Sequence, residues 1–189
     1  MSIKEASMLG LFKKKPADPP GLDPEAPIEI KTSIRIERDP AAIYPLLDFA
    51  DERHHMKARG NPVKQIGSSP DEFRAWSDRA PNLNFLFQVE TAIPGEAYAY
   101  FARIVPPVGK RIQSFEAYTL EPIGDGATKL TAKNIIQNQP GLSEAELQVE
   151  IARSTQAMMG FLTKLKIHAE EGVDRVIAFE REIGQRPAA

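Results

Sequence analysis

The sequence of 189 residues contains no cysteine. A chain without cysteine has no disulfide, no thiol nucleophile and no cysteine-ligated zinc or iron–sulfur cluster, so these classes of site are excluded. Because cysteine-free chains suit a reducing compartment, we expect a cytoplasmic protein. An excess of one charge is also lacking, since 24 Lys and Arg face 26 Asp and Glu, for a net charge of −2. That balance gives no basic surface for a nucleic acid, so we expect no nucleic-acid partner.

Long apolar runs are absent, and none approaches the roughly 18–20 residues that a membrane span needs. Secretory signals place their charges before the apolar run, whereas here an apolar patch precedes three lysines within residues 8–15. This patch predicts at most a weak contact with an anionic membrane surface. Five prolines fall between Pro16 and Pro27. We therefore expect residues 1–27 to form a flexible N-terminal tail and proline-rich linker.

Aromatic residues are scarce, at 7% of the chain, and nine of them fall between Phe73 and Tyr118. Prolines divide the same region into short apolar runs, which is typical of successive β-strands joined by turns. The predicted strands cover residues 63–68, 71–78, 84–93, 96–105, 111–121 and 127–137. Gly124-Asp125-Gly126 predicts a hairpin turn between the last two. The clustering predicts that the aromatic side chains line a cavity on this sheet more than they fill a uniform core.

Helical signals flank these strands. Ile28–Glu37 alternates apolar and polar residues and predicts a first strand, after which Asp39-Pro40 begins a short helix. Near the C-terminus, Ser143 and Glu146 form a capping box, and an apolar stripe follows at three- and four-residue steps. We expect Gly172 to bend or end this long helix.

Two segments carry a resemblance to a known family. They are residues 34–47 (IRIERDPAAIYPLL), where a strand runs into a helix, and residues 118–131 (YTLEPIGDGATKLT), a late hairpin with a glycine turn. Together with the long C-terminal helix, they resemble the START / Bet v 1-like (SRPBCC) superfamily, particularly its polyketide cyclase/dehydrase-like branch.

The resemblance implies an α+β helix-grip fold, in which a curved seven-stranded antiparallel sheet wraps around a long C-terminal helix, with short helices after strand 1. The ligand-binding domain would cover residues 28–183, followed by a disordered tail at 184–189. An apolar cavity between sheet and helix would bind a small hydrophobic molecule. We expect no cofactor.

Residue alternation assigns the two faces of the last hairpin. Lys129 and Lys133 share one face, which we expect to be wet, so Glu116 and Asn134 should face the helix close to one another. A buried carboxylate is costly unless it is paired or hydrogen-bonded. Glu116 and Asn134 are therefore the candidate catalytic residues, able to move protons or to orient a polar ligand head. The alternative is a structural Glu116 at the sheet edge or cavity mouth, bonded to water, Asn134 or Arg103.

Aromatic and methionine side chains are the candidate ligand contacts. The expected ligand-binding residues are Phe85, Phe87, Tyr98, Tyr100, Phe101, Tyr118, Met158, Met159 and Phe161. On the strand at 96–105, alternation leaves open whether Tyr98 and Tyr100 or Phe101 point inward. Plain core packing is the alternative for the phenylalanines.

Histidines offer little for a metal site. Asp51 and His55 are spaced i, i+4 on a predicted helix, as in some metal sites, but no third ligand follows. We therefore predict no metal site, and we expect His168 to be exposed among its charged neighbours.

Three functions are compatible with these features. The first is binding or transport of a small hydrophobic ligand, lipid-like or polyketide-like, in an internal cavity. The second is a cyclase/dehydratase-type enzyme in which Glu116, assisted by Tyr118 or Asn134, acts as the acid/base. The third is a membrane or protein interaction module. The ligand and the oligomeric state are not specified by the sequence.

Overall fold

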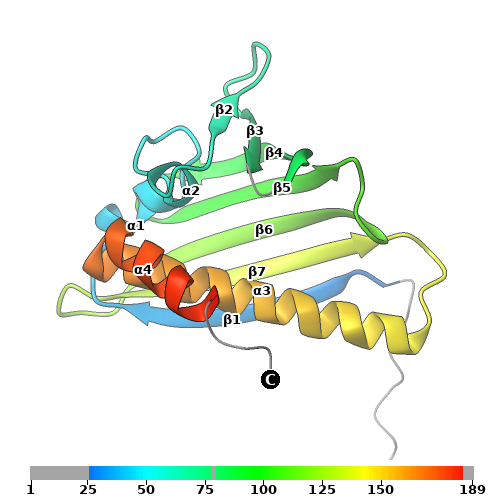
Figure 1. The fold of residues 1–189 in the computed structure, drawn as a ribbon. Coiled ribbons are helices and arrows are strands. Elements are labelled where there is room, and N and C mark those ends of the chain that lie inside the picture. The colour runs from blue at the N-terminus through cyan, green and yellow to red at the C-terminus, as the bar shows by residue number, and fades with distance from the viewer. Residues whose placement is uncertain (1–25, 78–79, 185–189) are drawn as a thin grey trace, which may run out of the picture.

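A single seven-stranded antiparallel sheet organises the computed structural model, which describes residues 26–77 and 80–184. The strands are β1 (Ile28–Ile36), β2 (Val63–Gln65), β3 (Glu72–Ser77), β4 (Ala80–Ile93), β5 (Ala97–Val105), β6 (Arg111–Pro122) and β7 (Thr128–Asn138). Their order is β1-β7-β6-β5-β4-β3-β2, so β2 to β7 lie side by side in sequence order and β1 pairs with β7 (Figure 1). All seven predicted strands are present. The predicted membrane contact of residues 8–15 lies outside the described residues.

The described residues also form four helices. They are α1 (Pro40–Leu47), α2 (His55–Ala58), α3 (Glu144–Glu171) and α4 (Val173–Gly184). The predicted capping box is confirmed, since the Ser143 hydroxyl accepts from the Glu146 amide and the Glu146 carboxylate accepts from the Ser143 amide. Gly172 ends α3 at a φ of 92°, a left-handed conformation that favours glycine. Figure 1 shows α3 lying across one face of the sheet. The helices α1, α2 and α4 gather at the end of the sheet where α3 ends.

The two sheet faces follow the predicted alternation. Tyr118 is paired with Ala132, and Glu116 with Asn134, on the face that α3 covers. Lys133 lies on the other face, where it pairs with Glu29. A shift of β7 by one residue would exchange its two faces. Lys129 and Lys133 therefore determine the register of β7 as much as its apolar residues do.

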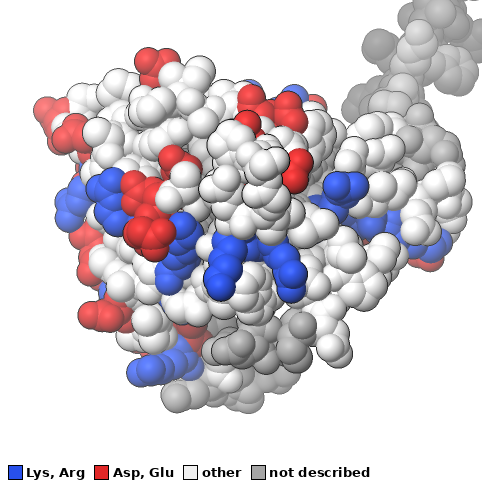
Figure 2. Space-filling model, turned by 90° about the horizontal axis from the view of Figure 1, so that it is seen from above, with Lys and Arg blue, Asp and Glu red and all other residues white. Residues whose placement is uncertain are grey.

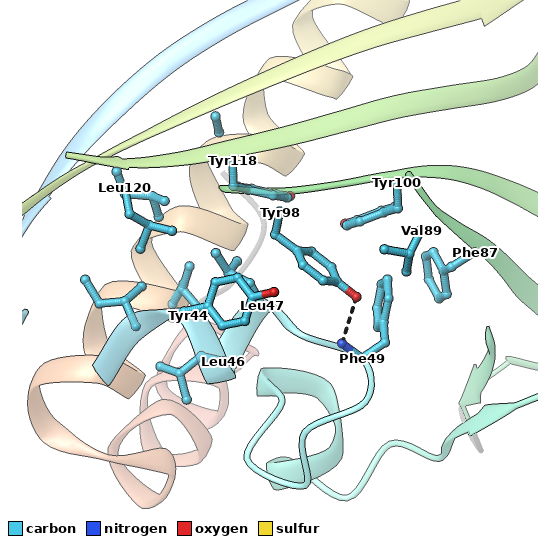
Figure 3. Close-up of a cluster of buried hydrophobic side chains, with 14 of the residues drawn as sticks. Tyr44, Leu46, Leu47, Phe49, Phe87, Val89, Tyr98, Tyr100, Tyr118 and Leu120 are labelled. Carbon is cyan, nitrogen blue, oxygen red and sulfur yellow. Dashed lines mark hydrogen bonds between the residues drawn. The ribbon is translucent and has the colours of Figure 1, made fainter. Parts of the chain in front are cut away.

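Aromatic side chains form a packed core at the α1–α2 end of the sheet. Phe49, just after α1, is at its centre: its ring stacks on Phe87 at a centroid distance of 4.4 Å and meets Tyr100 at 4.9 Å. The Phe49 amide donates to the Tyr98 hydroxyl at 3.1 Å (Figure 3). The prediction that the aromatics line a cavity more than they fill a core is therefore wrong for this group, because Phe49 fills the space between them.

Two apolar clusters hold α3 against the sheet. Leu162 and Leu165, in its C-terminal half, are fully buried in the aromatic core. Leu147, in its N-terminal half, is buried in a second cluster with residues of β1 and β7. Met158 packs against both clusters. The middle of α3 therefore spans the boundary between two separately packed regions.

Candidate functional site

An inner cavity of about 230 Å³ lies under the middle of α3, between the two clusters. Its lining residues are Arg111, Glu116, Tyr118, Asn134, Ser154, Ala157, Met158 and Phe161. Four of these belong to β6 and β7 and four to α3. The cavity exists because the α3 residues at this level, Ser154 and Ala157, are too small to fill the space above the sheet.

Glu116 is the carboxylate at the floor of this cavity. Its Oε2 accepts hydrogen bonds from the Tyr100 hydroxyl at 2.8 Å and the Tyr118 hydroxyl at 2.9 Å. The Ser114 hydroxyl lies 3.4 Å from Oε1. Burial, and then the nearby Glu116 charge, raise the pKa of both tyrosines well above the usual value, so both remain neutral donors at neutral pH. Figure 3 shows the hydroxyl ends of Tyr100 and Tyr118 turned toward one another.

Asn134 is the second polar side chain at the floor. It is the register partner of Glu116 across the β6–β7 pair, and it is 8% exposed. Its Oδ1 is buried and has no hydrogen-bond partner within the described part of the chain. A buried acceptor without a donor costs about 1–3 kcal/mol. Because Asn134 lines the cavity, a donor on a bound molecule would remove that cost.

Arg111 and Ser154 lie at the side of the cavity where β6 begins. The Arg111 Nη2 donates to the Ser154 hydroxyl at 2.8 Å, joining β6 to α3. Ser154 is buried, whereas the neighbouring Ala157 is exposed. The cavity therefore opens to solvent beside Ala157, and this hydrogen bond forms one edge of the opening.

The remaining wall is apolar. The Phe161 ring lies 5.7 Å from the Tyr118 ring, measured between centroids, and Met158 stands one turn away on α3. A ligand ring can pack against this aromatic pair, and a methionine adapts to its outline.

The structure brings together five of the predicted site residues, Glu116, Asn134, Tyr118, Met158 and Phe161. Tyr100 reaches the same group through its hydroxyl. Phe85, Phe87 and Tyr98 belong to the aromatic core and do not line the cavity. Their positions do not support the expected contact with a ligand in this cavity, and Phe49 packs beside Phe87 and Tyr98.

Two further predicted ligand contacts also lie away from this cavity. Phe101 lies on the opposite face of the sheet, against Phe115 at a centroid distance of 5.0 Å, because Tyr98 and Tyr100 take the inner face of β5. Met159 is 43% exposed, because one residue along a helix turns the side chain by about 100° from that of Met158.

Arg111 and Ser154 were missed in the sequence. Nothing in their local pattern marks them, since Arg111 opens a strand next to a proline-rich loop and Ser154 interrupts an apolar stripe. Of the two, only Ser154 could have been found from the sequence, because a small polar residue on a buried apolar stripe indicates unfilled space beside the helix.

The histidines do not lie as expected. His168 is half-buried on α3, and its Nδ1 is 3.0 Å from the Nδ1 of His55, which is 1% exposed. The prediction of an exposed His168 is therefore wrong, because α2 packs over it. Among residues 26–77 and 80–184, no group of three or more metal-ligating side chains is found.

A larger hollow of about 370 Å³ lies on the outer face of the sheet, beside Leu86 and Phe101. No buried polar atom without a partner is found among its described lining residues. The face in Figure 2 carries acidic and basic side chains together, without a broad area of one sign. We therefore place the candidate site in the inner cavity. In the described part of the chain, no helix has both the length and the apolar character required to cross a membrane.

Comparison with solved structures supports the fold. The chain is similar to DynU16, described as a putative protein in the dynemicin biosynthetic locus, at 16% identity and a TM-score of 0.57. That match covers 76% of this chain and 48% of DynU16, so this chain spans about half the length of that protein. Ara h 8.0201 matches at 10% identity and a TM-score of 0.57, over 76% of this chain and 97% of that one.

MLL2253 from Mesorhizobium loti matches at 15% identity and a TM-score of 0.58, over 78% of this chain and 98% of that one. No protein-family model matches the sequence, and no curated protein matches it. At such low identities these likenesses show the fold alone. The predicted helix-grip fold is therefore confirmed.

Proposed function

We propose that this helix-grip protein binds a small, mainly apolar molecule in the inner cavity beneath α3. One observation carries the proposal: an apolar cavity open to solvent has two polar side chains, Glu116 and Asn134, at its floor, and the Asn134 Oδ1 is buried without a partner. Sites for small molecules combine apolar walls with a few placed polar groups in this way.

The size of the cavity limits the ligand. An engineered cavity of about 150 Å³ holds benzene, whereas pockets for drug-sized ligands measure about 300–1,000 Å³. At about 230 Å³, this cavity suits a molecule of one or two rings, or a short chain. A sterol or a long-chain lipid exceeds that volume. A short polyketide-like or aromatic compound fits, and the dynemicin-locus origin of DynU16 is compatible with such chemistry.

Native mass spectrometry of the purified protein tests the proposal. We expect an adduct of a small organic molecule on the wild type that is lost on denaturation. Ala157→Trp should abolish it, because the indole would fill the opening. Ala152→Trp is the matched control, since Ala152 is exposed on α3 and does not line the cavity. Adducts of equal abundance in both variants would contradict the proposed location.

A second function, cyclase/dehydratase chemistry, is favoured by the convergence of Glu116, Tyr118 and Asn134 on one cavity. In such a reaction on a trione, the Glu116 carboxylate accepts a proton from a terminal methyl carbon next to one carbonyl, because attack by that carbon on the carbonyl five carbons away closes a six-membered ring. The Tyr118 hydroxyl donates a hydrogen bond to the carbonyl under attack, a carbon–carbon bond forms, and water leaves. We would follow the cyclisation of heptane-2,4,6-trione by absorbance. The wild type should cyclise the trione faster than buffer alone does, and Glu116→Gln should lose this rate enhancement. Equal rates for wild type and variant would contradict this role.

A further inference from the structure

We propose that the polar head of the bound molecule is a primary ammonium group, held between Glu116 and Asn134. This inference rests on the proposed function and deepens it, because it names the chemistry that the cavity floor recognises. It follows from a count of donors, acceptors and charges on the residues that line the cavity.

Hydrogen-bond acceptors are in excess at the cavity floor. Both tyrosine hydroxyls donate to the same Glu116 oxygen, Oε2, and among the described residues only the Ser114 hydroxyl, at 3.4 Å, donates to Oε1. The Asn134 Oδ1 receives no donor from the described residues. Register partners in an antiparallel pair have Cβ atoms about 4.5–5.5 Å apart. A single head group can therefore reach the two underused oxygens from one position.

Charge points to the same class of ligand. No ion pair with Glu116 occurs among residues 26–77 and 80–184. Arg111 is the one basic residue among those that line the cavity, and its Nη2 is bonded to Ser154 at the opening. Glu116 is half-buried, and a carboxylate partly removed from water without a counter-charge loses solvation, so a cation at the floor is favoured.

An ammonium group matches this floor better than other common heads. It supplies three donors, no acceptor and one positive charge. A hydroxyl supplies one donor and no charge, and a ketone supplies no donor. A carboxylate would bring two acceptors and a negative charge toward Glu116, although it could reach Arg111 at the opening. The ring-lined wall formed by Tyr118, Phe161 and Met158 would hold the apolar body.

Calorimetry at pH 7 with three probes of matched size tests the inference: 2-phenylethylamine, 2-phenylethanol and phenylacetate. We expect the amine to bind at least about tenfold more tightly than the alcohol, since charge-assisted hydrogen bonds are about twice as strong as neutral ones. Phenylacetate should bind most weakly. If the alcohol or phenylacetate binds as tightly as the amine, the ammonium assignment is overturned while the proposed cavity function stands.

Variants separate the head group from the cavity. Glu116→Gln should remove most of the amine preference and keep the affinity for 2-phenylethanol, which also shows that the cavity is intact. Asn134→Leu should lower the affinity for 2-phenylethylamine severalfold. Gln137→Leu, on the exposed face of the same strand, should leave that affinity unchanged. An amine preference that survives Glu116→Gln would overturn the inference. Absence of binding by all three probes would instead contradict the proposed function.

Discussion

Two buried histidines should make this protein unstable in mild acid. His54 and His55 are 5% and 1% exposed. The Arg59 guanidinium, which only donates, lies 3.4 Å from the His55 Nε2, so that nitrogen carries no proton and the His55 Nδ1–H donates to His168. Protonation of His55 would place a new N–H against a cation. Lys57 faces His54 and Lys164 faces His55, and both oppose a further positive charge.

The structure sets the sign and the size of the effect. Burial first, and then these cations, lower the pKa of His54 from 6.5 to about 3 and that of His55 to about 2. Between those values and 6.5, the unfolded chain binds more protons than the folded one, so stability is complete above pH 6.5 and falls as the pH drops. At 1.36 kcal/mol per pKa unit, lowering the pH from 7 to 5 removes roughly 2 kcal/mol per histidine. The loss is a large part of the roughly 5–15 kcal/mol of a typical domain.

Urea unfolding at pH 7 and pH 5 measures this loss. Through His54 and His55 the wild type should lose roughly 4 kcal/mol of unfolding free energy, and His55→Gln should lose roughly 2 kcal/mol less, since glutamine does not titrate. Each variant is compared with itself, so any constant destabilisation by the substitution cancels. Glu52→Gln is the control, because the Glu52 side chain is 90% exposed. An equal pH-dependent loss in wild type and His55→Gln would refute the reasoning.

Two further substitutions test the packing. Tyr98→Phe should lower the unfolding free energy by about 1–3 kcal/mol, because it leaves the buried Phe49 amide without an acceptor. The Tyr44 hydroxyl makes no hydrogen bond to another described residue. Tyr44→Phe should therefore change the unfolding free energy by less than about 0.5 kcal/mol in the same urea assay. Gly172→Ala should cost about 1 kcal/mol or more at a φ of 92°, whereas Gly160→Ala, inside α3 with open space around it, should be neutral or slightly stabilising by thermal unfolding. Equal effects of Tyr98→Phe and Tyr44→Phe would show that the Phe49 hydrogen bond is not the cause. Equal effects of Gly172→Ala and Gly160→Ala would show that the backbone conformation of Gly172 is not the cause.

Much of the fold followed from local patterns. Alternation located the strands, the capping box located the start of α3, and Gly172 located its end. The lysines on β7 were enough to predict that Glu116 and Asn134 face inward, because a lysine on the helix-covered face would be buried without a partner.

The aromatic residues were harder to place from the sequence. Both faces of β5 carry aromatic side chains, so alternation alone did not separate Tyr100 from Phe101. Phe49 lies in a short polar turn after α1, where nothing marks it as the centre of a core. His168 was misjudged for a similar reason, because the charged residues around it suggested an exposed position. Burial there depends on α2 docking against α3 through His55 and His168, which are 113 residues apart in the sequence.

The central claim is that the cavity beneath α3 binds a small ligand, and methyl NMR of adjacent methionines tests it most directly. Met158 lines the cavity, whereas Met159 is exposed. In protein labelled with ¹³C at the methionine methyl groups, titration with 2-phenylethanol should shift the Met158 signal saturably, through the ring current of the bound molecule. The Met159 signal should stay in place. No saturable shift at Met158, or an equal shift at Met159, would contradict the account.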